Sequence, residues 1–177
     1  MTNPDSDEAD VIMNQIIAQD EMYEAAREIL EKLLELMVIE ARVTPSEEFS
    51  VNTDEGITTS IGLNIEGDDL GILIGRRGQT MASLQHIVRI IMAHKMDIKI
   101  PVVIDVEGYK QRRCEGLRAL AVRLADQVKT RKIPFSMEPM SAFERRIVHL
   151  ALADRNDVFT ESTGVGMNRK VVIKPVT

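Results

Sequence analysis

The chain has 177 residues, of which 44% are hydrophobic, so it can form one packed domain or two small ones. It has no apolar run long enough for a membrane-spanning helix, its acidic start is not expected to be a secretory leader, and its single cysteine, Cys114, excludes an internal disulfide. The net charge of −6 is unevenly distributed: residues 1–57 carry a net charge of −12, and residues 58–177 carry +6. The larger part of the chain can therefore attract a polyanion.

The first third of the chain is predicted to hold a tail, a helix and two strands. Residues 1–19 are acidic and polar, which favours a flexible tail. In residues 20–42 apolar side chains recur at spacings of three and four, which predicts an amphipathic helix that ends before Pro45. A short strand and a turn at Gly56 are expected next, and the alternation in residues 57–65 predicts a half-buried strand.

The middle of the chain holds one ambiguous segment and two clear ones. The apolar run at 70–74 fits either a short helix capped by Asp68 or a strand. Apolar side chains on one face predict a helix over 79–95. Every second residue of 98–106 is apolar and β-branched, which predicts a strand, and Pro101 within it favours a sheet edge or a bulge.

The last seventy or so residues are predicted to form a second unit. A long helix starts near residue 107 and ends before Pro134, and a short strand follows it. Ser141 and Glu144 fit a capping box at the start of a helix that runs to about Ala153. A hairpin is expected at the end of the chain, with the following residues facing each other across its turn: Val158, Thr160, Ser162, Val171 and Ile173.

The segment Gly75-Arg76-Arg77-Gly78 is the first candidate site. Its glycines let the backbone turn tightly and let a ligand approach, and the helix that follows offers unpaired amides and a favourable dipole to an anion. The two arginines add guanidinium groups that suit phosphate oxygens. The spacing fits neither a nucleoside-triphosphate loop nor a dinucleotide loop. The segment therefore predicts a phosphodiester clamp, and a glycine turn with exposed arginines is the alternative.

The order helix, strand, strand, short apolar segment, Gly-Arg-Arg-Gly, helix, strand resembles the type II KH domain of RNA-binding proteins, with LGILIGRRGQTMASLQHIV as its signature. The resemblance implies an α+β fold of order α-β-β-α-α-β, with a three-stranded sheet and helices on one face. It makes 70–74 the first helix of a helix–loop–helix pair. In that family the loop grips the backbone of about four single-stranded nucleotides. Gly75, Arg76, Arg77 and Gly78 are the RNA-binding residues that it implies.

The predicted helix after Ser141 carries the second candidate site. If Phe143 lies on the core face, a rotation of about 100° per residue places Ile147 and Leu150 there too. Arg145 and His149 then share the opposite, solvent-facing side. Because they are four residues apart, the arginine and the imidazole are neighbours that can contact phosphate and bases. Two ordinary solvated polar residues are the alternative.

The segments MEPMSAFERRIVHLALADR and TESTGVGMNRKVVIKP resemble the R-three-H domain, a small α/β module that binds single-stranded nucleic acids and is named for its Arg-x-x-x-His motif. Arg145 and His149 occupy the motif positions, and Arg169 and Lys170 are a further basic extension on the hairpin. A type II KH domain followed by this domain resembles the bacterial Jag family, also called KhpB or EloR. That family implies a cytoplasmic RNA-binding regulator linked to cell elongation and division. It also implies pairing with a small single-KH protein.

The resemblance predicts three parts: an acidic flexible tail at 1–19, a KH domain at 20–107 and an R-three-H domain at 108–177. Many members of the family carry an additional N-terminal domain connected with the membrane. The segment before the first predicted helix has only about twenty residues, too short for that domain. The chain is therefore expected to lack it, and direct membrane association is not expected.

Two other classes of function compete with RNA binding. A protein-interaction scaffold would use the KH surface to form a homodimer or a heterodimer, and it would tolerate replacement of Arg76 and Arg77. An enzyme is not expected, because His86, His94 and His149 are the only histidines and none has the spacing of a metal site or of a nucleophile's base. No cofactor and no metal site are predicted. The expected partner is single-stranded RNA, with a single-KH protein or a second copy of the chain as a further partner.

Overall fold

The computed structural model describes residues 4–46, 50–53, 56–96 and 101–176 and divides the chain into two compact units, Met1–Gly108 and Tyr109–Thr177. Both units combine helices with a small antiparallel or mixed sheet, so the fold class is α+β, as predicted. The division falls one residue after the boundary expected from the sequence.

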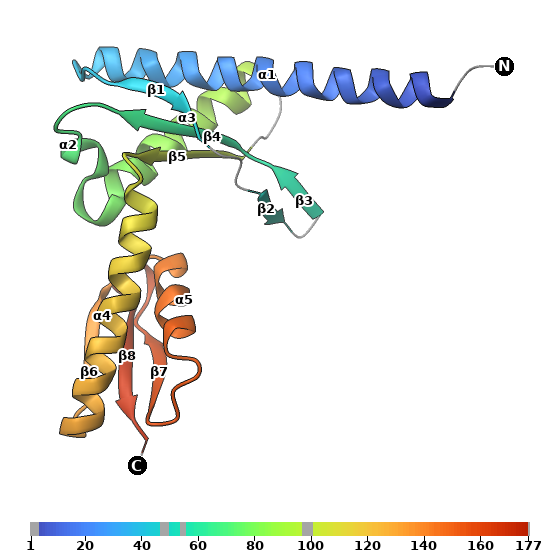
Figure 1. Cartoon of the computed structure of the whole chain (residues 1–177). Helices are drawn as coiled ribbons and strands as arrows, with labels where there is room; N and C mark the ends of the chain where they lie inside the picture. Colours follow the sequence, from blue (N-terminus) through green and yellow to red (C-terminus); the bar gives the residue numbers. More distant parts are fainter. Residues whose placement is uncertain (1–3, 47–49, 54–55, 97–100, 177) are drawn as a thin grey trace. The chain divides into compact units, whose positions relative to one another are not determined.

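The first unit contains a three-stranded sheet with helices on one face (Figure 1). The sheet has the order β1 (Arg42–Pro45), β4 (Ile61–Glu66), β5 (Val102–Val106), with β1 antiparallel and β5 parallel to the central β4. Helices α1 (Pro4–Leu36) and α3 (Gln79–Met96) lie over this sheet and contact each other. The core consists of their buried side chains and those of the sheet, among them Ala26, Leu30, Leu34, Leu63, Ile65, Leu84, Val88, Met92 and Ile104.

The strand predicted at 57–65 is divided in the structure. Residues Gly56–Thr59 form β3, which pairs with β2 (Ser50–Thr53) in a separate hairpin, and β4 begins at Ile61 after the buried Ser60. The strand predicted at 98–106 is β5, which starts directly after Pro101 at an edge of the sheet. This edge position agrees with the missing amide of proline. Residues 98–100 of that prediction lie outside the described residues.

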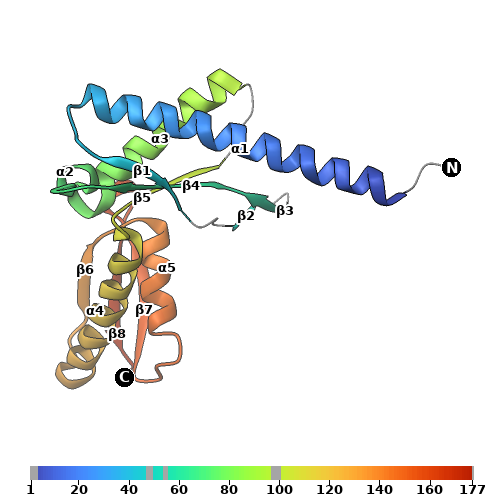
Figure 2. The same ribbon diagram turned by 45° about the horizontal axis from the view of Figure 1, so that its top comes forward.

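Helix α1 differs from its prediction at both ends. Residues 4–19, predicted to be flexible, form its first turns, which extend beyond the sheet in both views (Figures 1 and 2). A proline in the first turn and the acidic residues after it suit a helix N-terminus. The helix ends at Leu36, so the prediction that it continues to residue 42 is wrong and β1 was missed.

The end of α1 has the hydrogen bonds of a Schellman motif. The amide of Ile39 donates to the Leu34 carbonyl at 3.0 Å, and that of Val38 donates to the Glu35 carbonyl at 2.9 Å. Val38 has φ = 58°, the left-handed conformation that this motif normally gives to glycine. A β-branched residue is a poor signal for such a turn, and this is why the sequence pattern did not show the end of the helix.

The second unit has two helices on one face of an antiparallel sheet. The strand order is β6 (Phe135–Pro139), β8 (Lys170–Pro175), β7 (Val158–Thr163), and α4 (Tyr109–Arg131) and α5 (Ala142–Ala151) contact this sheet and each other. The predicted hairpin is confirmed, with Thr160 opposite Ile173 and Ser162 opposite Val171 and a short 3-10 turn, η2 (Gly166–Asn168), between the strands. The core comprises Ala121, Leu124, Ala125, Val128, Met137, Val148, Leu152, Val158, Val171 and Ile173.

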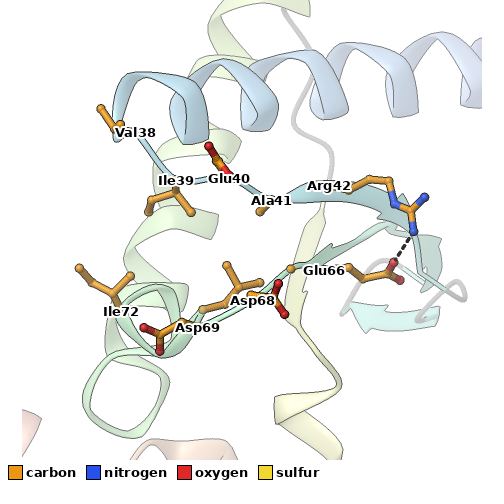
Figure 3. Close-up of a pocket in the computed structure, with 11 residues that line it drawn as sticks. Val38, Ile39, Glu40, Ala41, Arg42, Glu66, Asp68, Asp69 and Ile72 are labelled. Atoms are coloured by element: carbon orange, nitrogen blue, oxygen red, sulfur yellow. Dashed lines mark hydrogen bonds and ion pairs between the residues drawn. The ribbon is translucent and has the colours of Figure 1, made fainter.

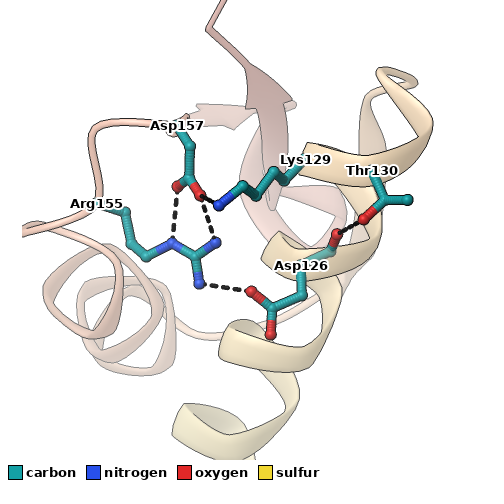
Figure 4. A network of polar contacts seen from close by, with 5 residues as sticks. All are labelled: Asp126, Lys129, Thr130, Arg155 and Asp157. Atoms are coloured by element: carbon teal, nitrogen blue, oxygen red, sulfur yellow. Dashed lines mark hydrogen bonds and ion pairs between the residues drawn. The ribbon is translucent and has the colours of Figure 1, made fainter.

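Two polar clusters hold α4 to the elements that follow it. The predicted capping box is present, since the Ser141 amide donates to Glu144 Oε2 at 2.9 Å and the Glu144 amide donates to Ser141 Oγ at 3.2 Å; Arg113 of α4 pairs with the other carboxylate oxygen of Glu144 at 2.8 Å. In the second cluster, Arg155 bridges Asp126 of α4 and Asp157 before β7 (Figure 4). The first cluster positions α5, which carries one of the predicted motifs, and the second holds the segment between α5 and β7 against α4.

Candidate nucleic-acid interface

The Gly75–Gly78 loop connects α2 (Gly71–Ile74) to α3, so the short helix expected from the KH resemblance is present. Residues Arg76–Gly78 form a single 3-10 turn, η1. Gly75 has φ = 66° and ψ = −169°, a combination open almost only to glycine. A Cβ at this position would lie 1.9 Å from Thr80 Oγ1. Both the backbone and its surroundings therefore require glycine here.

The loop places two cations directly before α3. Arg76 is exposed and Arg77, with φ = 57°, is half-buried. The first turn of α3 contains no acidic residue, so no side chain offsets the positive end of its helix dipole. Backbone amides, a helix N-terminus and guanidinium groups together can bind a phosphate. The four predicted loop residues thus share one turn of the backbone that suits an anion.

Helix α5 does not face the sheet as predicted. Phe143 and Leu150, expected in the core, are 65% and 63% exposed, whereas Glu144, Ile147 and Val148 are buried. The predicted orientation assumed that Phe143 faces the core, but in the structure α5 is rotated about its axis so that Phe143 is exposed. The reason is that the capping box and Arg113 draw Glu144 inward, and the apolar residues that follow it at helical spacing form the packed face.

This rotation brings Arg145 and His149 against β7 rather than into solvent, so their predicted placement on the open side is wrong. The His149 ring nitrogens lie 2.6 Å from Thr160 Oγ1 (Nδ1) and 2.9 Å from Ser162 Oγ (Nε2), and Arg145 Nη1 donates to Ser162 Oγ at 3.3 Å. The two motif residues are therefore joined through one hydroxyl. The sequence predicted that Thr160 and Ser162 lie on one face of the hairpin, but it did not predict that they contact α5.

The environment of this cluster keeps the imidazole neutral and leaves one donor unused. Burial lowers the pKa of His149 below its ordinary value, and the neighbouring Arg145 charge lowers it further. Among the polar side-chain atoms in the described part of the chain, Arg145 Nε is buried and has no hydrogen-bond partner. An anion beside this pair would stabilise the imidazolium and offset the arginine charge, so the cluster is suited to phosphate.

Arg169 and Lys170 lie on the hairpin as predicted, but Lys170 does not join this cluster. It pairs with Thr163 in the β7–β8 register, one residue from the buried Val171. Because side chains alternate along a strand, Lys170 points to the face of the sheet opposite α5. Arg169 is exposed just before β8. RNA that contacts both these residues and the Arg145–His149 pair would have to pass around the edge of β7.

A hollow of about 540 Å³ lies between the end of α1 and the corner before α2 (Figure 3). Its lining includes four carboxylates and one guanidinium, Arg42, which pairs with Glu66 at 3.4 Å. The Thr44 hydroxyl, together with Asn64 and Arg42, lowers the pKa of Glu66 and keeps it ionised. This negative hollow is unsuited to RNA. The remaining lining residues are Val38, Ile39, Glu40, Ala41, Gly67, Asp68, Asp69, Leu70 and Ile72.

The charge of the two units differs in sign. From the sequence, the first unit has 8 basic and 21 acidic residues, a net charge of −13, and the second has 14 basic and 7 acidic residues, a net charge of +7. In the described segments no helix is long and apolar enough to cross a membrane. Nor do the residues described there bring three or more His, Cys, Asp or Glu side chains together as metal ligands.

Comparison with known proteins matches both units to families. Residues 27–104 match the KH domain of the KhpA and KhpB proteins, and residues 115–175 match the R-three-H domain. The RNA-binding protein KhpB of Clostridium symbiosum is 37% identical over 155 residues, which cover 88% of this chain and 67% of that protein. KhpB of Bacillus subtilis is 35% identical over 116 residues, which cover 64% of this chain and 56% of that protein.

Proposed function

Since the chain belongs to the KhpB family of RNA-binding proteins, a family of binding proteins and not of enzymes, we propose that it binds single-stranded RNA through phosphate contacts at two sites, the Gly75–Gly78 loop and the Arg145–His149 pair. The observation that carries this proposal is the joining of Arg145 and His149 through Ser162. It brings two phosphate-binding groups together in the unit with net charge +7.

At the loop, backbone groups supply most of the proposed phosphate contacts. Gly75 lets the chain turn without a side chain in the path of the ligand, and the start of α3 presents amides and a positive dipole end to a phosphate. Arg76, which is exposed, then adds a bidentate contact. Such contacts follow the RNA backbone and carry little sequence information.

At Arg145 and His149, side chains supply the contacts. When a phosphate binds, the imidazole takes up a proton and donates to the phosphate or to a hydroxyl of β7, and the guanidinium neutralises a second oxygen. Thr160 and Ser162 hold the ring in place. The low aromatic content, 3%, limits base stacking, so phosphate contacts are expected to dominate the affinity.

Fluorescence anisotropy of a labelled single-stranded RNA tests this proposal. Arg76→Asp should weaken binding about 10-fold or more, and Arg89→Asp is the matched control, because Arg89 is also exposed in the first unit and its reversal changes the net charge equally. Raising the salt concentration should weaken wild-type binding steeply. Equal losses for the two variants, or a flat salt response, would contradict the phosphate contacts.

We propose that the protein acts in the cytoplasm on transcripts linked to cell elongation and division. The test is a deletion strain complemented with the wild type, Arg76→Asp or Arg145→Ala. The wild type should restore cell length and the two variants should not. Restoration by both variants at equal protein levels would separate the cell-shape role from RNA binding.

Exposed apolar residues at the end of α1 and in α2, two of which (Val38 and Ile72) line the hollow in Figure 3, favour a second function, contact with a protein partner. Leu36, Val38 and Ile72 are 69%, 89% and 71% exposed, and such a group is typical of an interaction surface. The proposed partner is a single-KH protein or a second copy of the chain. Ile72→Asp should shift the mass measured by light scattering toward the monomer, and it should weaken RNA binding less than Arg76→Asp does.

A further inference from the structure

We propose that the outer face of α5, formed by Phe143, Arg146 and Leu150 and here called the α5 stripe, binds the bases of RNA whose phosphate lies at Arg145 and His149. The inference rests on the proposed RNA binding and adds a base-stacking subsite to it. No described residue carries a hydrogen bond or ion pair to Arg146, which is exposed, and the two apolar residues are 65% and 63% exposed.

The three side chains form one continuous surface. Arg146 is three residues after Phe143 and four before Leu150, so all three are neighbours on the helix. The side of α5 that packs against the core carries Glu144, Ile147 and Val148 instead. Single exposed apolar residues are ordinary on protein surfaces. Here two large exposed apolar residues flank an arginine on a ten-residue helix, and neither of them packs into the core of this unit.

Charge and position both favour RNA as the occupant. The stripe belongs to the unit of net charge +7, and its central residue is a cation. Arg146 lies three residues before His149, so the two side chains are adjacent on the helix surface. A nucleotide whose phosphate contacts His149 therefore has its base within reach of Arg146. Guanidinium planes and aromatic rings are the groups on which unpaired bases stack, and Leu150 adds apolar surface beside them.

The same unit offers a matched control in Phe159. This residue is 50% exposed on β7, next to Thr160, whose hydroxyl contacts His149. Because Thr160 points toward α5, Phe159 points to the opposite face of the sheet. There the ammonium of Lys174 lies 5.9 Å from the centre of its ring. Replacement of Phe159 removes the same aromatic group from the same unit without touching the α5 stripe.

The experiment compares the full-length wild type with Phe143→Ala and Phe159→Ala, using labelled oligouridine RNA and the same RNA with abasic riboses. Phe143→Ala should weaken binding to the intact RNA about 5- to 100-fold, and Phe159→Ala should not. On the abasic RNA the loss caused by Phe143→Ala should disappear. The dependence of affinity on salt should stay unchanged, because no phosphate contact is removed. Phe143→Leu, which keeps the apolar surface, should lose most of the stacking.

The other outcomes overturn the inference in distinguishable ways. If Phe143→Ala binds the intact RNA as tightly as the wild type while Arg145→Ala does not, RNA binds at the phosphate site but not at the α5 stripe. Equal losses on intact and abasic RNA would show that Phe143 acts through the fold or through a protein contact. If the wild type shows no salt-dependent binding, the proposed function itself fails, and the base subsite fails with it.

Discussion

The two units form their candidate anion sites from different groups, the first mainly from the backbone and the second from side chains. The first, with net charge −13, depends on backbone: Gly75 and Arg77 have positive φ, and the loop opens at the start of α3. The second, with net charge +7, depends on side chains held by hydroxyls, on a regular helix and strand. A unit whose overall field repels RNA needs local, short-range donors, whereas a positive unit also attracts RNA from a distance.

The largest effect is expected for Arg145→Ala. It removes a charged donor from the positive unit and leaves Ser162 without that contact, so RNA affinity should fall about 10- to 100-fold. The slope of log affinity against log salt should decrease by about one. Arg76→Ala should have a smaller effect on both quantities. A larger loss of RNA affinity for Arg76→Ala than for Arg145→Ala in anisotropy titrations would contradict this difference between the units.

Gly75→Ala tests the dependence of the first unit on its backbone. The added Cβ would meet Thr80, and φ = 66° strains any other residue, so the free energy of unfolding should fall by about 1–3 kcal/mol. RNA binding at the loop should be lost as well. Gly71→Ala is the control, since a Cβ there has no neighbour within 4 Å. Equal denaturation midpoints for the two variants would contradict the strain argument.

Glu144→Ala tests how the second unit positions its side chains. It removes the capping box and the partner of Arg113, and unfolding free energy should fall by about 1–2 kcal/mol. Because α5 would lose its anchor, chemical shifts of His149 should move although the residue itself is intact. Unchanged shifts in an NMR spectrum, with an unchanged melting temperature, would show that other contacts position α5.

Val38→Gly is expected to stabilise the first unit. Val38 has φ = 58° and is 89% exposed, so glycine relieves strain while little packing is lost. The free energy of unfolding should rise by about 1 kcal/mol, measured by chemical denaturation. Val38→Ala, which keeps a Cβ in the left-handed conformation, should give a smaller gain. A loss of stability in Val38→Gly would indicate that the valine makes contacts that offset its strain.

The last expected effect is a pH dependence near neutral pH that arises from His149 in the second unit. The pKa of His149 is lowered in the folded protein, so the unfolded chain binds more protons below about pH 6.5, and stability is lost as the pH falls through that range. Bound phosphate favours the imidazolium and raises this pKa. RNA affinity should therefore increase as the pH falls from 7, by up to about tenfold per unit of pKa change.

An imidazole titration by NMR, with and without RNA, measures both effects. In Arg145→Ala the pKa of His149 should rise in the free protein, because a neighbouring positive charge is gone. His149→Ala should abolish the pH dependence of RNA affinity near neutral pH. A His149 pKa that RNA leaves unchanged would place the phosphate away from the ring.

Spacing, caps and alternation along a few neighbouring residues were enough to predict most of the helices, the capping box at Ser141 and Glu144, the residues that face each other in the last hairpin, and both short motifs. Tertiary structure decided three other things. α1 ends at a valine in a glycine conformation, which local preference does not favour. The alternating run at 57–65 is divided between two sheets. α5 is rotated so that Arg145 and His149 meet β7. That rotation depends on Arg113, thirty-one residues from Glu144 in the chain, and a contact over such a distance leaves no periodic signal in the helix that it orients.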